Sequence, residues 1–201
     1  MWACNCPVPA PAQRRAQAGS TALEFGIVLI LFLSIAFGAL ELARAMYLYH
    51  TLQMATQRAA ALAAKTDFSD AAAMSAVRQQ ALFRSSPGPL ILGSPVTDAH
   101  IRIDYLSLSN AGAVTMSAIP AATLPACPAN NRITCTRDPY DASCIRLVRA
   151  RICEPAQADA CNNVPYQSLF SFVSLPLSLP KATAIVPAET LGATAGALPC
   201  P

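Results

Sequence analysis

The stretch AGSTALEFGIVLILFLSIAFGALELARA, residues 18–45, decides the fold class of the N-terminal part of the chain. From Phe25 to Leu40 every residue is apolar or small, and the run extends through Ala43 if Glu41 is tolerated. A helix rises about 1.5 Å per residue, so about 20 such residues span the roughly 30 Å of a bilayer's hydrocarbon. The sequence therefore predicts one transmembrane helix over residues 20–43.

The composition of the whole chain agrees with a protein that partly avoids water. Its 201 residues are 54% hydrophobic and only 12% charged, whereas about a quarter of the residues of a soluble protein are charged. The net charge is +3, and the basic residues are scattered. A nucleic-acid-binding surface needs clustered Lys and Arg, so we expect no nucleic-acid partner.

The basic residues around the apolar run predict its orientation. Arg14 and Arg15 lie before it, and Arg44 is the first basic residue after it. Basic residues favour the cytoplasmic side, so the N-terminus is expected in the cytoplasm. Everything after about residue 45 is then exported.

Cysteines are concentrated in the exported part. Two of the eight, Cys4 and Cys6, precede the apolar run, and the remaining six are Cys127, Cys135, Cys144, Cys153, Cys161 and Cys200. Structural zinc sites use closely paired ligands, whereas the first five of these are separated by seven or eight residues. We therefore expect disulfides and no metal. Fifteen connectivities are possible, and the short loops Cys127–Cys135 and Cys153–Cys161 are preferred.

Glu24 is a carboxylate at the start of the apolar run, and two interpretations compete. An acid near the bilayer is costly unless it is paired, which makes it a candidate functional residue. Alternatively, Thr21 and Glu24 have the spacing of a capping box, in which the acid only satisfies a free amide at the helix start.

Basic residues, then Gly19, then Ser20, then Glu24 at the fifth position after the glycine and a long apolar helix resemble a type IV prepilin leader. The motif GSTALEF, with the later ELARAMYLYHTLQMATQRAAALAA, resembles the TadE-like minor pseudopilins of tight-adherence (Flp) pili. The ending LPLSLPKATAIVPAETLG is similar to the strand and nearby acid that close such chains.

The resemblance implies a role and a set of partners. Residues 1–19 would be a leader removed by a prepilin peptidase after Gly19, which frees an amine on Ser20. Glu24 would then register one subunit against the next through that amine. The expected protein is a structural subunit of the bacterial inner membrane with a periplasmic C-terminal part, possible incorporation into a pilus, and other pilins, pseudopilins and the assembly platform as partners.

Residues 44–86 are expected to form a periplasmic helical region. The long helix should continue to Ala64, because residues 42–64 contain no Gly or Pro. Apolar residues recur there at steps of three or four and form a stripe able to pack on a globular domain: Leu48, Leu52, Ala55, Ala59 and Leu62. Asp and Ser capping candidates in residues 66–84 predict a second helix of about 14 residues.

Residues 87–201 are expected to form a β-rich head. Alternating patterns predict strands at 100–108, 112–119, 144–152, 168–177 and 181–187, the first two as a hairpin. Residues 120–143 and 154–166, rich in Pro, Asn and Asp, are expected as disulfide-tied loops. The fold class is thus α+β: a long N-terminal transmembrane and amphipathic helix, a second helix, and a small antiparallel sheet.

Nothing in the sequence favours an enzyme, and we expect no cofactor. The chain has two histidines, His50 and His100, and lacks G-x-S-x-G, P-loop, H-E-x-x-H and C-x-x-C motifs. Four loop acids could face a hard cation but lack the spacing of an EF-hand: Asp138, Asp141, Glu154 and Asp159.

Two other interpretations of the N-terminal part stay open. Ala43-x-Ala45 fits the small-residue rule of signal peptidase, so the chain could be a secreted disulfide-bonded protein cut near Ala45. It could also be a membrane-tethered periplasmic binding module that is never cut. The three interpretations predict a mature chain that begins at Ser20, at Met46 or at the original N-terminus.

Overall fold

The computed structural model describes residues 18–110, 112–156, 160–170, 177–194, 196 and 200. The chain divides into two compact units, one ending at Leu42 and one beginning at Ala43. The helices are α1 (Ala18–Ala63), α2 (Ala71–Ala81) and α3 (Pro128–Arg137), with short 3-10 turns at Asp98–His100 and Ala121–Thr123. The strands are β1 (Ile101–Ser109), β2 (Thr115–Ala118), β3 (Leu147–Ile152) and β4 (Thr183–Pro187). These elements confirm the α+β class; most of the predicted leader lies outside the described residues.

The first helix, α1, is continuous over 46 residues, which confirms the expected helix to within a residue or two at each end. The apolar run is rich in Leu, Ile and Ala and contains no proline, so nothing interrupts the helix. In the unit that begins at Ala43, the predicted stripe is buried: Leu48, Leu52, Ala55 and Ala59 are fully buried, and Leu62 is partly buried.

The second helix, α2, begins where the sequence predicts a cap. Asp70 has an extended backbone, and its carboxylate accepts hydrogen bonds from the amides of Ala72 and Ala73, at 2.9 and 3.1 Å. These bonds satisfy donors that have no partner within the helix. The helix is 11 residues long, slightly shorter than predicted, because Leu82 and Phe83 already leave it.

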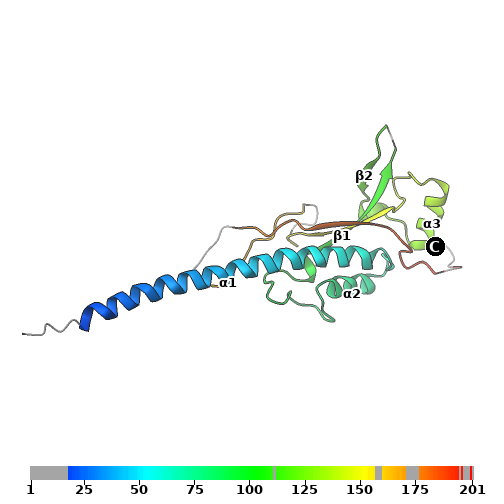
Figure 1. Cartoon of the computed structure of the whole chain (residues 1–201). Helices are drawn as coiled ribbons and strands as arrows, with labels where there is room; N and C mark the ends of the chain where they lie inside the picture. Colours follow the sequence, from blue (N-terminus) through cyan, green and yellow to red (C-terminus); the bar gives the residue numbers. More distant parts are fainter. Residues whose placement is uncertain are drawn as a thin grey trace, which may run out of the picture. The chain divides into compact units, whose positions relative to one another are not determined.

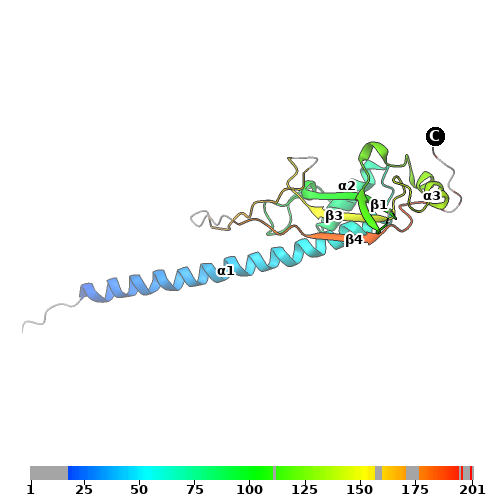
Figure 2. The ribbon, with the colours of Figure 1, turned by 90° about the horizontal axis from the view of Figure 1, so that it is seen from above.

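The four strands form one antiparallel sheet in the order β2-β1-β3-β4. Tyr105 of β1 lies opposite Val148 of β3, and Val148 in turn lies opposite Val186 of β4. The predicted hairpin of β1 and β2 is present, with Ser109 opposite Thr115. Figures 1 and 2 show the sheet running along the C-terminal half of α1.

One face of the sheet packs on the helices. Ile101, Ala150 and Ile152 share a core with the buried stripe of α1. Tyr105 and Val148 share a second core with Met74 and Val77 of α2. Both helices therefore lie on the same side of the sheet (Figure 1), and the opposite face, here called the outer face, carries the other set of alternating side chains.

One prediction about residues 120–177 needs correction, and another falls largely outside the described residues. Loop is predicted for residues 120–143, but α3 forms within them. Pro128 at the first helical position is compatible with a helix start, and the buried Asn131 side chain accepts from the Ile145 amide at 2.8 Å, which holds the helix on the head. The strand predicted at 168–177 lies largely outside the described residues; near its end, Ser178 forms an isolated bridge with Pro165.

Candidate membrane anchor and assembly segment

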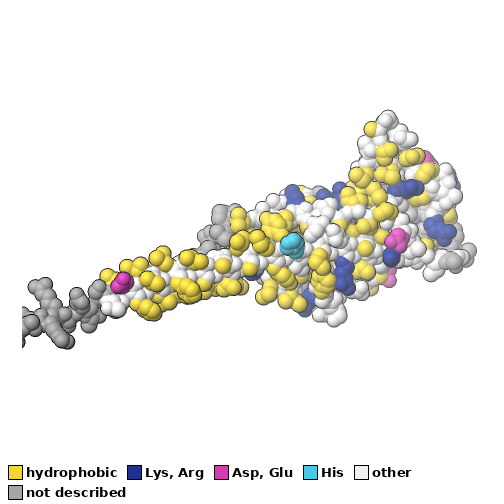
Figure 3. Space-filling model, viewed as in Figure 1, with side chains coloured by type: hydrophobic (Ala, Val, Ile, Leu, Met, Phe, Trp, Pro, Cys, Tyr) yellow, Lys and Arg dark blue, Asp and Glu magenta, His cyan; other side chains and the backbone are white. Residues whose placement is uncertain are grey.

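The N-terminal half of α1 is apolar and unburied. Within the described residues, Thr21–Ala63 is the one helix long and apolar enough to cross a membrane by length and composition. Its most apolar stretch of 18 residues has a mean hydropathy of 2.4, and no residue of that stretch is buried. Figure 3 shows hydrophobic side chains along this part of the helix. The exposed large side chains include Leu23, Phe25, Ile27, Val28, Ile30, Leu31, Phe32, Ile35 and Leu40.

Such a surface is unfavourable in water. Apolar area costs about 25 cal/mol per Å² left in contact with water, and large contiguous exposed patches mark sites of protein or membrane contact. The exposed apolar side chains of α1 therefore require a bilayer, other apolar helices, or both.

The predicted cleavage and registry residues lie at the start of this helix. Gly19 and Ser20 belong to the first turn of α1, and the Glu24 side chain is exposed. Because the helix begins at Ala18, Thr21 is already helical, whereas an N-cap residue has a non-helical backbone. The capping box considered for Thr21 and Glu24 is therefore absent from the uncut chain.

Residues 19–61 match the family model for TadE-like proteins. The match begins at the predicted cleavage glycine and ends two residues before the end of α1. It confirms the resemblance over residues 19–61, here called the TadE-like segment, and leaves the head outside the matched region. Comparisons with curated proteins and with solved structures give no match.

Arg44, inside the TadE-like segment, ties α1 to two loops of the head. Its Nε donates to the Leu92 carbonyl at 3.1 Å, and its Nη2 donates to the Ser94 carbonyl at 3.2 Å. Nη1 donates to the Gln167 carbonyl, and the guanidinium lies 5.3 Å from the centre of the Tyr166 ring. The sequence indicates only a basic residue after an apolar run, because the loop carbonyls that Arg44 meets lie about 50 and 120 residues away.

All six cysteines that follow the apolar run are paired, in the combinations Cys127–Cys200, Cys135–Cys144 and Cys153–Cys161. The preferred loop Cys153–Cys161 is confirmed, and the preferred loop Cys127–Cys135 is wrong. Cys127 is the N-cap of α3 and Cys135 lies within that helix. Eight residues of helix separate them by about 12 Å along the axis, well beyond the Cα distance that a disulfide can bridge.

The outer face of the sheet carries an ion-pair cluster that the sequence patterns do not predict. The Asp104 carboxylate accepts from Arg102 at 3.1 Å, Arg149 at 3.1 Å and Arg151 at 2.6 Å. Burial favours a raised pKa for Asp104, but the guanidiniums of Arg151, Arg149 and Arg102 outweigh it and lower this pKa below its usual value. The alternating segments IRID and RLVRARI contain the four residues of the cluster, but only strand pairing brings their charges together.

The two histidines have different surroundings. His50 is exposed on α1. His100 is buried, and its Nδ1 accepts from the Thr97 amide at 3.1 Å. Burial lowers the pKa of His100, although Glu154 and Asp98 oppose this shift. A buried neutral imidazole at the entry of β1 is a structural feature rather than a catalytic arrangement.

The loop acids do not assemble into a metal site. Asp138 accepts from the Tyr140 amide, and Asp141 accepts from the amide and hydroxyl of Ser143. Among the described residues, no three His, Cys, Asp or Glu side chains come close enough to hold a metal ion. Asp159 lies outside the described residues.

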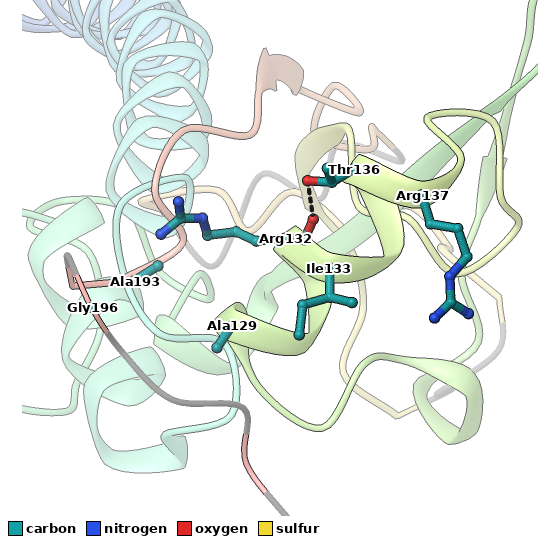
Figure 4. Close-up of a pocket in the computed structure, with 7 residues that line it drawn as sticks. All are labelled: Ala129, Arg132, Ile133, Thr136, Arg137, Ala193 and Gly196. Carbon is teal, nitrogen blue, oxygen red and sulfur yellow. Dashed lines mark hydrogen bonds between the residues drawn. The ribbon is translucent and has the colours of Figure 1, made fainter.

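A cavity of about 530 Å³ lies beside α3 (Figure 4). Arg132 and Arg137 point to different sides of it, and the Thr136 hydroxyl donates to the Arg132 carbonyl at 2.7 Å. The described lining residues contain no acid, histidine or thiol: they are Ala129, Arg132, Ile133, Thr136, Arg137, Ala193 and Gly196. The one hydroxyl in that set, on Thr136, donates to a backbone carbonyl, and no general base stands beside it among these described residues, so the cavity does not suggest a reaction.

Proposed function

We propose that this protein is a minor pseudopilin, a structural and assembly subunit of a Flp-type (tight-adherence) pilus. The observation that carries the proposal is the TadE-like match over residues 19–61, which coincides with a helix whose N-terminal half is apolar and unburied. The role is structural: the helix anchors and packs the subunit, and the head is presented outside the cytoplasm.

Processing by a prepilin peptidase after Gly19 is part of this proposal. The first turn of a helix lacks the intrahelical bonds of its N–H groups, and glycine lowers helix stability by about 1 kcal/mol relative to alanine. Opening the chain at Gly19 therefore costs little. Residues 1–19 form the leader, 20–43 the membrane span, 44–86 the periplasmic helical region and 87–201 the head.

The proposed orientation places the N-terminus in the cytoplasm and the head in the periplasm of a bacterial cell. Three disulfides support an oxidising compartment for the head, because cytosolic thiols are kept reduced. The proposed partners are the peptidase, the assembly platform, and other pilins and pseudopilins.

Glu24 is proposed to register this subunit against a neighbour. Cleavage frees an amine on Ser20, four residues before Glu24, and both groups then lie at the edge of an apolar helix surface. An ion pair in such surroundings is worth much more than one in water, and a charge left without its partner is strongly unfavourable. The neighbour's amine or another complementary group would satisfy Glu24.

The deciding experiment compares Glu24→Gln with the wild type in a bacterium that carries a complete Flp pilus system. We expect the variant to be inserted and cut after Gly19 but to lose co-purification with its pilin partners from membranes. Glu189→Gln, in an exposed ion pair of the head, is the control and should recover partners normally. Normal recovery with Glu24→Gln would remove the registry role and leave the acid as a local helix residue.

The signal-peptide alternative meets a structural obstacle. A cut after Ala45 would remove Arg44 and its hydrogen bonds to the carbonyls of Leu92, Ser94 and Gln167. Mass spectrometry of the mature N-terminus separates the three interpretations, because they predict Ser20, Met46 and an uncut chain. We expect Ser20.

A further inference from the structure

A β-turn of the head, Leu90–Gly93, presents two large apolar side chains to solvent. The Gly93 amide donates to the Leu90 carbonyl at 2.9 Å, and the Leu90 amide donates to the Val96 carbonyl at 2.8 Å. Leu90 and Val96 are buried and hold the turn on the core. At its tip, Ile91 is 61% exposed and Leu92 is 68% exposed.

Leu92 is an unfavourable residue for its backbone conformation. It has a φ of 54° at the third position of the turn, where glycine or asparagine is ordinarily found. A left-handed conformation is unfavourable for a branched or bulky side chain, because its Cβ comes too close to the following carbonyl oxygen. Stability in water therefore favours a small or polar residue here, so an exposed leucine in this conformation points to a partner for its side chain.

The backbone of this turn is hydrogen-bonded to α1 just after the apolar run of the helix ends. The Tyr47 hydroxyl donates to the Ile91 carbonyl at 3.2 Å, and Arg44 Nε donates to the Leu92 carbonyl at 3.1 Å. Arg44 and Tyr47 follow Ala43 by one and four residues, or by about 1.5 to 6 Å along the helix. The interfacial layer on each side of the hydrocarbon is about 5 to 7 Å thick, which matches this distance from Ala43, the end of the proposed span.

We propose that the tip formed by Ile91 and Leu92 inserts into the interfacial layer of the same membrane that α1 spans, and so seats the head on a lipid surface. This inference rests on the membrane anchor of the proposed function. Tyr47 and Tyr49, both exposed on α1, suit the same layer because aromatic residues with a polar end concentrate there.

A lipid surface fits the tip better than a second protein chain. Stable protein interfaces bury about 800 Å² on each partner, far more than two side chains supply. Insertion into lipid has no such threshold, because each apolar side chain gains free energy in proportion to the area it removes from water. The positively charged Arg44 beside the turn is also suited to the headgroup layer, where basic side chains reach the lipid surface.

The test uses fluorescence of the full-length chain reconstituted into lipid vesicles. Trp2 is the one tryptophan of the sequence, so Trp2→Phe provides a background without this residue. Three single-tryptophan variants are then compared: Leu92→Trp at the tip, Phe32→Trp in the apolar run, and Met116→Trp on β2 as an exposed control. Lipids brominated along their chains quench a tryptophan in the membrane, and acrylamide quenches one in water.

We expect Leu92→Trp to be quenched by shallow bromines, with blue-shifted emission and severalfold weaker acrylamide quenching than Met116→Trp. Phe32→Trp should be quenched by deep bromines. If Phe32→Trp responds and Leu92→Trp behaves like Met116→Trp, the tip proposal is wrong and the anchor stands. If Phe32→Trp stays accessible to acrylamide, the anchor itself fails. A Leu92→Trp signal shielded from both quenchers would indicate a protein contact and would also overturn the lipid assignment.

Discussion

The carboxylate of Asp104 on β1 accepts a 2.6 Å hydrogen bond from Nη2 of Arg151 on β3. Arg149, directly opposite Asp104 in the register, donates to the same oxygen, and Arg102 donates to the other. One acid thus neutralises part of the charge of three arginines on the outer face. Only 12% of the Asp104 side chain is exposed, so these bonds are partly shielded from water.

Asp104→Asn should destabilise the head by about 2 to 3 kcal/mol at pH 7, because hydrogen bonds to charged groups contribute about 1.5 to 3 kcal/mol each and three guanidiniums lose their counter-charge. Urea unfolding of the full chain in detergent measures this difference. Glu189→Gln is a matched control, since its pair with Lys65 is exposed and should change stability by less than about 1 kcal/mol.

The Asp104 contribution should also depend on pH. Its pKa is lowered in the folded state, so the contribution is fully present above the unfolded value of about 3.9 and is lost as pH falls through the lower folded value. Wild type and Asp104→Asn should therefore converge in stability below about pH 4. A constant difference across that range would show that the carboxylate acts through shape alone.

Folding stability should also depend on pH through His100, at a higher pH than through Asp104. Burial lowers its pKa, so the unfolded chain binds this proton more readily, and stability falls as pH drops below the unfolded value of about 6.5. His100→Asn retains an acceptor near the Thr97 amide but does not titrate, so the decline between about pH 7 and 5 should shrink. His50→Asn, at an exposed position, should leave it unchanged; equal slopes in both variants would exclude His100 as the source.

The disulfides should differ in their effect on stability. Cys127–Cys200 closes a separation of 73 residues and Cys153–Cys161 one of 8. Chain-entropy estimates give about 4.4 and about 2.6 kcal/mol for the two bridges. Replacing each pair with serines, followed by urea unfolding, should preserve this order. Non-reducing peptide mapping checks the pairing first, and a Cys127–Cys135 fragment would contradict the structure.

Gly19→Val should block processing while leaving membrane insertion intact. The substitution places a branched side chain at the proposed cut and does not alter the apolar run. Immunoblotting of membrane fractions should show only the longer, uncut species. Ala22→Val, three residues further along the same helix, is the control and should still be cut. Normal-sized processed protein from Gly19→Val would remove the prepilin interpretation.

Local sequence patterns are sufficient to predict an element whose structure depends only on its own residues. The apolar run predicts α1, the Asp and Ser capping candidates predict the start of α2, and alternation predicts β1, β3 and β4, because helix caps and side-chain periodicity act over a few residues. The residues at the start of α1 also indicate the TadE-like family by their order alone, since that motif is contiguous in the chain. Gly19, Ser20 and Glu24 retain their proposed roles as predictions, because the uncut chain does not reveal a cut or a neighbour.

Tertiary structure decides what depends on distant partners. The helix α3 is weak by local preference and is held by Asn131 on Ile145 and by disulfides to Cys144 and Cys200. Strand register places three arginines around Asp104, and Arg44 donates hydrogen bonds to carbonyls far along the chain. The sequence by itself determines short-range helix and strand preferences, whereas these contacts join residues separated by tens of positions, whose proximity exists only after the core has packed.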